Sequence, residues 1–174
     1  MQPVHLLQQC NRVARARRAR QARRSPREVF TEVYAKRLWG TAEGGDVSSG
    51  SGSRGETAAA YVEEVQRFIL HHKVSKVADL GCGDFFIGRQ IAEVCASYAG
   101  VDVVPALVAR NTAMFGGERI RFECLDIVDD ELPDAELCLV RQVLQHLSNA
   151  QIAKILPKLA KYRYVLVTEQ YPAD

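Results

Sequence analysis

The sequence of 174 residues lacks the features that mark several classes of protein. No stretch approaches the roughly 20 consecutive apolar residues of a membrane-spanning helix, so we expect no membrane span. The five cysteines are irregularly spaced and include no CxxC pair, which argues against a zinc site and favours a reducing compartment. We therefore expect a cytoplasmic protein without a bound metal.

Acidic residues are missing from residues 1–27, which carry eight arginines. The remaining residues have 15 basic and 21 acidic side chains, a net charge of −6, so we do not expect the folded part to bind nucleic acid. The basic segment itself fits a solvated tail without a role, an organelle transit segment or a binding arm for an anionic partner. The transit alternative would place the protein in an organelle.

Residues 28–73 are expected to form two helices joined by a loop. Ser25-Pro26-Arg27-Glu28 is a capping box with proline at the first helical position, and we expect its helix to end near Trp39-Gly40. The loop from Thr41 to Gly55 is rich in glycine and serine, and a second amphipathic helix is expected at about Glu56–His72. The loop is either a plain linker or a lid over a binding site. If the loop is a lid, we expect the substrate to contact Trp39, Ser51, Gly52 and Ser53.

Residues 74–174 alternate between short apolar runs and amphipathic segments. This pattern predicts a doubly wound, Rossmann-like α/β domain with a mostly parallel sheet of about five strands. We expect helices at Phe86–Ser97, at Pro105–Phe115 and from Ser148 onward, with Pro157 kinking or shortening the last one. The expected strands are Lys76–Leu80, Tyr98–Val103, Arg119–Leu125, Ala135–Val140 and Tyr164–Thr168.

The first expected strand runs into the turn Asp79-Leu80-Gly81-Cys82-Gly83. Ligands of such a sheet bind at the carboxyl ends of the strands, and two glycines there let the backbone approach a ligand closely. An NAD-type fold would need a third glycine where this sequence has Phe86. Asp79 would repel a pyrophosphate, so the turn favours a cationic ligand.

Two further acids stand at the ends of the next two strands. Asp102 follows Gly83 by nineteen residues, a spacing that suits a carboxylate bound to both ribose hydroxyls. Asp126 could accept a hydrogen bond from the exocyclic amine of a base. The simpler alternatives are a helix cap ahead of Pro105 for Asp102 and a loop cap for Asp126.

These strand-end motifs resemble those of the class I S-adenosylmethionine-dependent methyltransferases. The resemblance covers about Glu28–Thr168, and the upstream Trp39-Gly40 and serine-glycine run are similar to a subgroup of small bacterial-type methyltransferases. One departure is Arg141-Gln142, where related sequences often have Arg-Asp. The motifs are Asp79-x-Gly81-x-Gly83, Gly100-Val101-Asp102, Leu125-Asp126-Ile127 and the segment 139–147.

The resemblance implies S-adenosylmethionine as the cofactor and assigns a part of it to each matching residue. The two glycines of the turn would pass close to the methionine part, with Cys82 between them as small filler. Arg141 would lie near the methionine or the substrate unless it is only a salt-bridge partner, and His146 would face the transferred methyl or cap a helix. The remaining assignments are the ammonium group to Asp79, the ribose to Asp102, and the adenine to Val103, Asp126 and Ile127.

The predicted function is methyl transfer to a small-molecule acceptor, with His146 or Glu169 as a base if one is needed. The family's sheet has two more strands after the fifth, whereas this sequence stops just past Thr168. The alternatives are therefore a truncated methyltransferase fold that acts as a scaffold subunit and, less favoured, an NAD-type oxidoreductase. An apolar fifth strand at the sheet edge could also pair in a homodimer.

Overall fold

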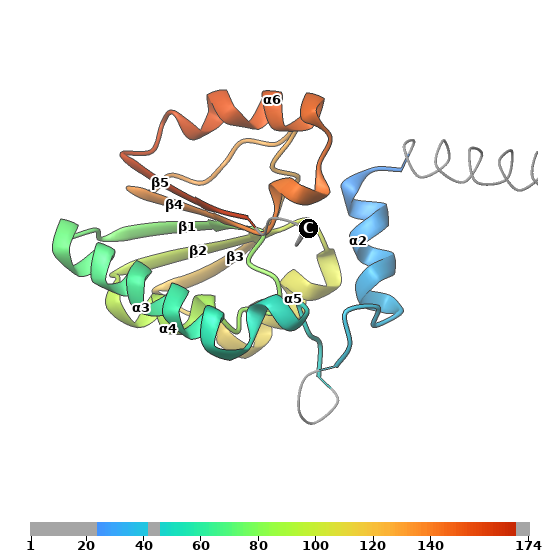
Figure 1. Ribbon diagram of the computed structural model, residues 1–174, viewed down its shortest axis with the longest axis horizontal. Coiled ribbons are helices and arrows are strands. Elements are labelled where there is room, and N and C mark those ends of the chain that lie inside the picture. The colour runs from blue at the N-terminus through green and yellow to red at the C-terminus, as the bar shows by residue number, and fades with distance from the viewer. Residues whose placement is uncertain (1–23, 42–45, 170–174) are drawn as a thin grey trace, which may run out of the picture.

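A parallel β-sheet forms the centre of the computed structural model, which describes residues 24–41 and 46–169. Its strand order is β3-β2-β1-β4-β5, and every neighbouring pair is parallel (Figure 1). The strands are β1 (Lys76–Leu80), β2 (Ser97–Asp102), β3 (Ile120–Cys124), β4 (Leu137–Arg141) and β5 (Tyr164–Thr168). The chain order reverses between β1 and β4, which is where a doubly wound sheet binds its ligand.

Helices cover both faces of the sheet because its central strands are buried on both sides. On one face, α3 (Gly55–His72) and α4 (Gly88–Ile91) pack with Val77 and Leu139. On the other face, α6 (Asn149–Leu159) packs with Ala78 and Val140 (Figure 1). Helix α5 (Pro105–Phe115) contacts β2 and β3. The doubly wound α/β fold predicted from the sequence is confirmed.

The prediction of one long helix at Phe86–Ser97 is wrong. It is replaced by the single turn of α4 and the 3₁₀ helix η3 (Ala92–Val94). Strand β2 already begins at Ser97, and the backbone N–H groups of Ala96 and Ser97 donate to the carbonyl of Ser75. The chain must therefore be extended by Cys95, which leaves no room for a long helix.

The first helix, α2 (Pro26–Ala35), begins with the predicted capping box but ends before Trp39. Arg37 adopts a left-handed backbone with φ 51°, and the N–H of Leu38 donates to the carbonyl of Val33, which closes the helix. Helix α6 continues past Pro157 to Leu159, so the helix does not end at this proline.

Helix α2 lies beyond the carboxyl ends of the strands, opposite the point where the chain order reverses (Figure 1). None of its residues is buried, so it lies against the domain without forming part of the core. The predicted basic arm, residues 1–27, falls almost entirely outside the described residues. Within the described ranges, no helix has the length and apolarity that crossing a membrane requires.

Candidate functional site

A cavity of about 500 Å³ lies at the carboxyl ends of β1, β2 and β4. The residues predicted for the site line this one cavity, with the exception of the alternative base Glu169, although they come from segments far apart in the sequence. Among the described residues, no group of His, Cys, Asp or Glu side chains is arranged to hold a metal ion. The predicted residues that line the cavity are Trp39, Ser51, Gly52, Ser53, Asp79, Gly81, Cys82, Gly83, Asp102, Val103, Asp126, Ile127, Arg141 and His146.

The glycine turn after β1 has a backbone that only glycine adopts without strain. Gly81 has φ 82° and Gly83 has φ 57°, both in the left-handed region. A Cβ atom at Gly81 would clash with the side chain of Val143, and one at Gly83 would clash with the hydroxyl of Ser49. The N–H groups of Gly81 and Cys82 donate to the carbonyl of Val101 at 2.8 and 2.9 Å, which ties the turn to β2. The turn therefore presents bare backbone to the cavity.

Asp79 is a buried carboxylate on the floor of the cavity, with 7% of the residue exposed. The hydroxyl of Tyr98 donates to it. Burial raises the pKa of Asp79 to about 6, although the Tyr98 hydrogen bond and the positive charge of Arg141 both lower it. A cationic ligand would favour the ionised form of this carboxylate and lower its pKa further.

Asp102 holds the glycine turn from the neighbouring strand. Its carboxylate accepts hydrogen bonds from the N–H groups of Gly83 at 3.1 Å and Val104 at 3.0 Å. Burial raises its pKa to about 6 in spite of these hydrogen bonds. The helix-cap alternative is wrong, because the cap residue of α5 is Val104. Two N–H donors orient the carboxylate, which still lines the cavity.

Asp126 lines the cavity together with Val103, Leu125 and Ile127. Its Oδ1 accepts from the N–H of Val128 at 2.9 Å, so it also caps the turn that follows β3. This hydrogen bond is the one that the loop-cap alternative expected. Asp126 also lies in the cavity wall, and its second carboxylate oxygen can accept a hydrogen bond from a ligand.

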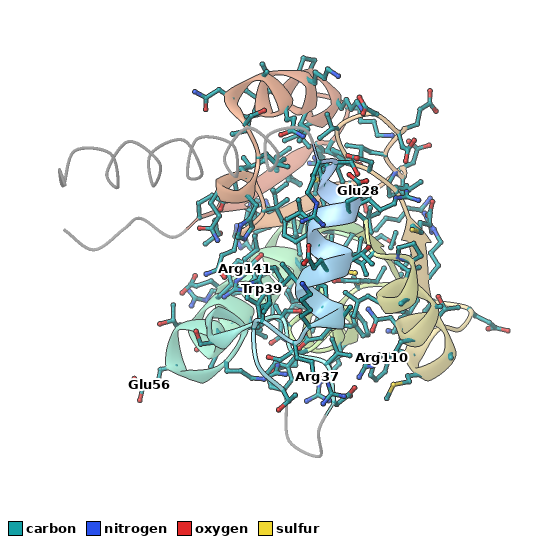
Figure 2. The ribbon with its side chains drawn as sticks, turned by 90° about the vertical axis from the view of Figure 1, so that its right-hand side faces the viewer. Glu28, Arg37, Trp39, Glu56, Arg110 and Arg141 are labelled. Atoms are coloured by element: carbon teal, nitrogen blue, oxygen red, sulfur yellow. The ribbon has the colours of Figure 1, made fainter. Side chains whose placement is uncertain are left out.

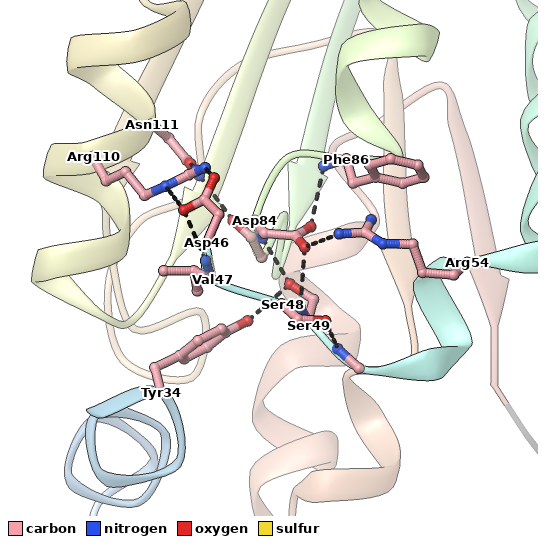
Figure 3. Close-up of polar contacts among 12 residues, drawn as sticks. Tyr34, Asp46, Val47, Ser48, Ser49, Arg54, Asp84, Phe86, Arg110 and Asn111 are labelled. Atoms are coloured by element: carbon pink, nitrogen blue, oxygen red, sulfur yellow. Dashed lines mark hydrogen bonds and ion pairs between the residues drawn. The ribbon is translucent and has the colours of Figure 1, made fainter. Parts of the chain in front are cut away.

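The loop between α2 and α3 is attached directly to the glycine turn, a contact that the sequence did not indicate (Figure 3). The hydroxyl of Ser49 accepts from the N–H of Asp84 at 2.7 Å, and the N–H of Ser49 donates to the Asp84 carboxylate at 3.1 Å. Arg54 forms an ion pair with the same carboxylate at 3.0 Å, and the hydroxyl of Tyr34 is 3.0 Å from that of Ser49. The loop therefore forms part of the cavity wall, and its role as a lid stays a prediction.

Arg141, at the end of β4, reaches across to this loop and donates to the carbonyl of Gly52. Its guanidinium also lies over the ring of Tyr61, 5.0 Å from the ring centre. Arg141 lines the cavity, as does Trp39, and both are labelled in Figure 2. The Nε of Arg141 is buried and has no hydrogen-bond partner in the described structure. No carboxylate pairs with Arg141 among the described residues, so the salt-bridge alternative is wrong there.

His146 lies in the cavity wall, at the end of the 3₁₀ helix η4 (Leu144–His146). Its ring centre is 5.4 Å from that of Phe30 and 5.8 Å from that of Trp39, and burial lowers its pKa. Glu169 is outside the cavity lining and accepts from the N–H groups of the residues at 143–145 at 2.9 to 3.4 Å. Glu169 therefore caps η4, and of the two predicted bases only His146 lies in the cavity.

The comparison with known proteins agrees with this geometry. Residues 77–162 match a family model described as a methyltransferase domain. These residues are a methyltransferase domain. They include the glycine turn, Asp102, Asp126 and Arg141. The methyltransferase family and the cofactor-binding fold predicted from the sequence are therefore confirmed. A search of curated proteins found no match.

Solved structures of methyltransferases share the fold of this domain. N-methyltransferase NodS from Bradyrhizobium japonicum WM9, in complex with S-adenosyl-L-homocysteine, has a TM-score of 0.52 at 20% identity over 59% of this chain and 55% of its own. Human N-acetylserotonin methyltransferase with S-adenosylmethionine has 0.52 at 20% identity over 63% of this chain and 33% of its own. The methyltransferase domain of bacterial CtHen1-CN has 0.55 at 19% identity over 63% and 65%. The chain thus spans between a third and two thirds of these relatives.

Proposed function

We propose that this protein transfers a methyl group from S-adenosylmethionine to a small molecule. The observation that carries the proposal is the set of strand-end residues around one cavity: the bare glycine turn, Asp79, Asp102 and Asp126. A glycine turn with a buried acid beneath it and an acid at each of the next two strands supplies contacts for an amino acid, a ribose and a base in that order. NodS and human N-acetylserotonin methyltransferase, which share the fold, are described with S-adenosyl-L-homocysteine and S-adenosylmethionine.

The residues present fit each part of this cofactor. Asp79 would hold the ammonium group, and the partnerless Nε of Arg141 would donate to the carboxylate of the methionine part. Asp102 would accept from the ribose hydroxyls while Val103, Asp126 and Ile127 surround the adenine. A buried, partnerless donor costs free energy, and a ligand carboxylate would remove that cost. The unpaired Nε of Arg141 therefore supports binding of an anionic group beside the glycine turn.

The cofactor supplies a methyl group already activated by its positive sulfur, so the protein mainly has to position the reactants and exclude water. The loop that carries Ser51, Gly52 and Ser53 would cover the cofactor, held by Asp84 and Arg141. We propose His146 as the base: its lowered pKa leaves it neutral near pH 7. Attack of the acceptor oxygen on the methyl carbon would break the carbon–sulfur bond and leave S-adenosyl-L-homocysteine, while the hydroxyl proton would pass to the imidazole of His146 and then to water.

Calorimetric titration of the full chain with S-adenosyl-L-homocysteine tests this proposal. We expect binding in the micromolar range, and Asp102→Ala should weaken it by about 1.5–3 kcal/mol, as expected for a lost hydrogen bond to a charged group. Asp129→Ala is the matched control because Asp129 is exposed on the surface and, among the described residues, its side chain pairs with Lys154 alone. Absence of binding would refute the enzyme proposal, and equal affinities for the two variants would refute the ribose role of Asp102.

We also propose that the edge of the sheet at β5 pairs with a second copy of the chain. Strand β5 pairs with β4 on one side, and no strand of the described structure pairs with its other side. Val167 of this strand is 49% exposed, which is unusual for an apolar strand residue. Light scattering after size-exclusion chromatography should give twice the chain mass for the natural protein and the single mass for Val167→Lys. A natural chain that elutes as a monomer would contradict the pairing.

We further propose that the chain divides into a basic arm (1–27), a helical extension (28–73) and the cofactor-binding core (74–174). We also propose that the protein acts in the reducing cytoplasm. The free thiols of Cys82, Cys95 and Cys138, all buried in the described structure, support the reducing compartment. Limited proteolysis should cut first within the arm and leave a fragment that still binds S-adenosyl-L-homocysteine.

A further inference from the structure

The cavity has a second wall that the cofactor contacts proposed above do not use. We call it the aromatic wall; it consists of Phe30, Tyr34, Trp39 and His146, all of which line the cavity. The centres of the Phe30 and Trp39 rings are 5.9 Å apart, and those of Tyr34 and Trp39 are 5.3 Å apart. The ring of His146 lies 5.8 Å from that of Trp39 at an interplanar angle of 36°. The four rings thus form one continuous part of the cavity lining.

Three of the four rings of this wall come from the segment before the core, and only His146 comes from the core itself. Phe30 and Tyr34 lie one turn apart on α2, the helix without a buried residue, and Trp39 follows that helix. Amphipathic helices normally bury their apolar face against the core. Helix α2 instead turns its aromatic side chains toward the cavity, where their apolar surface would be covered by a ligand.

The aromatic wall is uncharged near neutral pH. Burial raises the pKa of Tyr34 far above its usual value and lowers that of His146, so both side chains are neutral. The wall itself carries no carboxylate. The other carboxylates of the cavity lining are engaged, Asp79, Asp102 and Asp126 by the cofactor as proposed above and Asp84 by Arg54.

Cationic side chains are scarcer than carboxylates along the described cavity lining. Arg141 is its one lysine or arginine, and its guanidinium already contacts Gly52 and Tyr61. A cationic acceptor would find no free carboxylate at the wall, and a phosphorylated acceptor would find no free cation there. The charge distribution therefore selects a neutral acceptor.

We propose that the methyl acceptor is a neutral molecule with a flat aromatic ring that packs on Phe30 and Trp39 and places a hydroxyl beside His146. This inference rests on the function proposed above and adds the class of the acceptor. Flat rings pack favourably in tilted and edge-on arrangements against aromatic side chains, whereas a saturated ring of the same size gains only from burial of its surface. The neutral imidazole of His146 accepts the hydrogen bond of the hydroxyl.

Three probes with the same fused two-ring carbon skeleton test the proposal by equilibrium dialysis against the full chain saturated with S-adenosyl-L-homocysteine. They are 2-naphthol, its saturated analogue decahydro-2-naphthol, and 2-naphthylmethylamine, which is cationic near neutral pH. We expect 2-naphthol to bind at least about tenfold more tightly than either of the others. The saturated probe controls for apolar area, and the amine controls for charge.

Two variants locate the binding surface. Phe30→Leu and Trp39→Leu should each weaken 2-naphthol binding by about fivefold or more, while affinity for S-adenosyl-L-homocysteine changes by less than about twofold. Phe68→Leu is the matched control because Phe68 contacts His72 and Tyr164 and does not line the cavity. Unchanged affinity for S-adenosyl-L-homocysteine also shows that each variant folds.

The outcomes separate this inference from the proposed function. If S-adenosyl-L-homocysteine does not bind, the proposed function itself fails. If it binds but decahydro-2-naphthol matches 2-naphthol, the wall recognises apolar surface and the aromatic assignment is overturned. If the amine binds most tightly, the acceptor is a cation and the assignment is likewise overturned.

Discussion

Asp84 should be the residue that attaches the loop between α2 and α3 to the cofactor site. Its carboxylate accepts three hydrogen bonds, from the N–H groups of Ser49 and Phe86 and from the guanidinium of Arg54, at 3.0 to 3.1 Å (Figure 3). Its side chain is 4% exposed, so water cannot replace these partners without opening the loop. We therefore choose Asp84→Asn, which keeps the size of the side chain and removes its charge.

The expected loss follows from which oxygen is replaced. The single amide oxygen of asparagine replaces only one of the two carboxylate oxygens. If it faces Ser49 and Arg54, the NH₂ group faces the N–H of Phe86; if it faces Phe86, the NH₂ group faces Ser49 and Arg54, and in either orientation the negative charge beside Arg54 is lost. A hydrogen bond to a charged group contributes about 1.5–3 kcal/mol. The Arg54 side chain is 31% exposed, so water offsets part of its loss. We expect Asp84→Asn to lower the free energy of unfolding by about 2–4 kcal/mol.

Urea denaturation followed by circular dichroism and by the fluorescence of Trp39, the single tryptophan, measures this loss. Asp129→Asn is the matched control: its ion pair with Lys154 joins side chains that are 69% and 61% exposed and should contribute at most about 1 kcal/mol. Asp84→Asn should also weaken binding of S-adenosyl-L-homocysteine, because the loop lines the cavity. The reasoning is refuted if both variants lose the same free energy, within about 0.5 kcal/mol.

Two further predictions concern the floor of the cavity. Burial raises the pKa of Asp79 and Asp102 to about 6, so both carboxylates protonate as the pH falls through that value and lose their attraction for an ammonium group and ribose hydroxyls. Affinity for S-adenosyl-L-homocysteine, measured by calorimetry, should be constant above about pH 7 and fall about tenfold per carboxylate for each pH unit below about 6; an affinity independent of pH would exclude both contacts. Gly83→Ala should cost about 1–2 kcal/mol of stability for its left-handed backbone and displace Ser49. Gly117→Ala, in open space, is the control, and similar thermal unfolding of the two variants would contradict the clash.

Several parts of the site could be predicted because their signals are local in the sequence. The capping box before α2 is formed by Ser25 and Glu28, three residues apart. Asp102 could be assigned to the cavity because parallel strands bring their carboxyl ends together whichever helices join them. Gly81 and Gly83 could be assigned to the turn because few other residues adopt its backbone.

Hydrophobic periodicity, glycine placement and the spacing of acids thus determined the fold class, the cofactor end of the sheet and most of the cavity lining. The tertiary structure alone decided the contacts between segments far apart in the chain. Ser49 and Asp84 are 35 residues apart in the sequence, and Phe30 contacts His146, which is still farther away along the chain. Neither pair has a periodic or local signal, because each contact exists only once α2 and its loop lie across the strand ends. The attachment of the loop and the aromatic wall are therefore properties of packing, whereas the glycine turn is a property of the sequence.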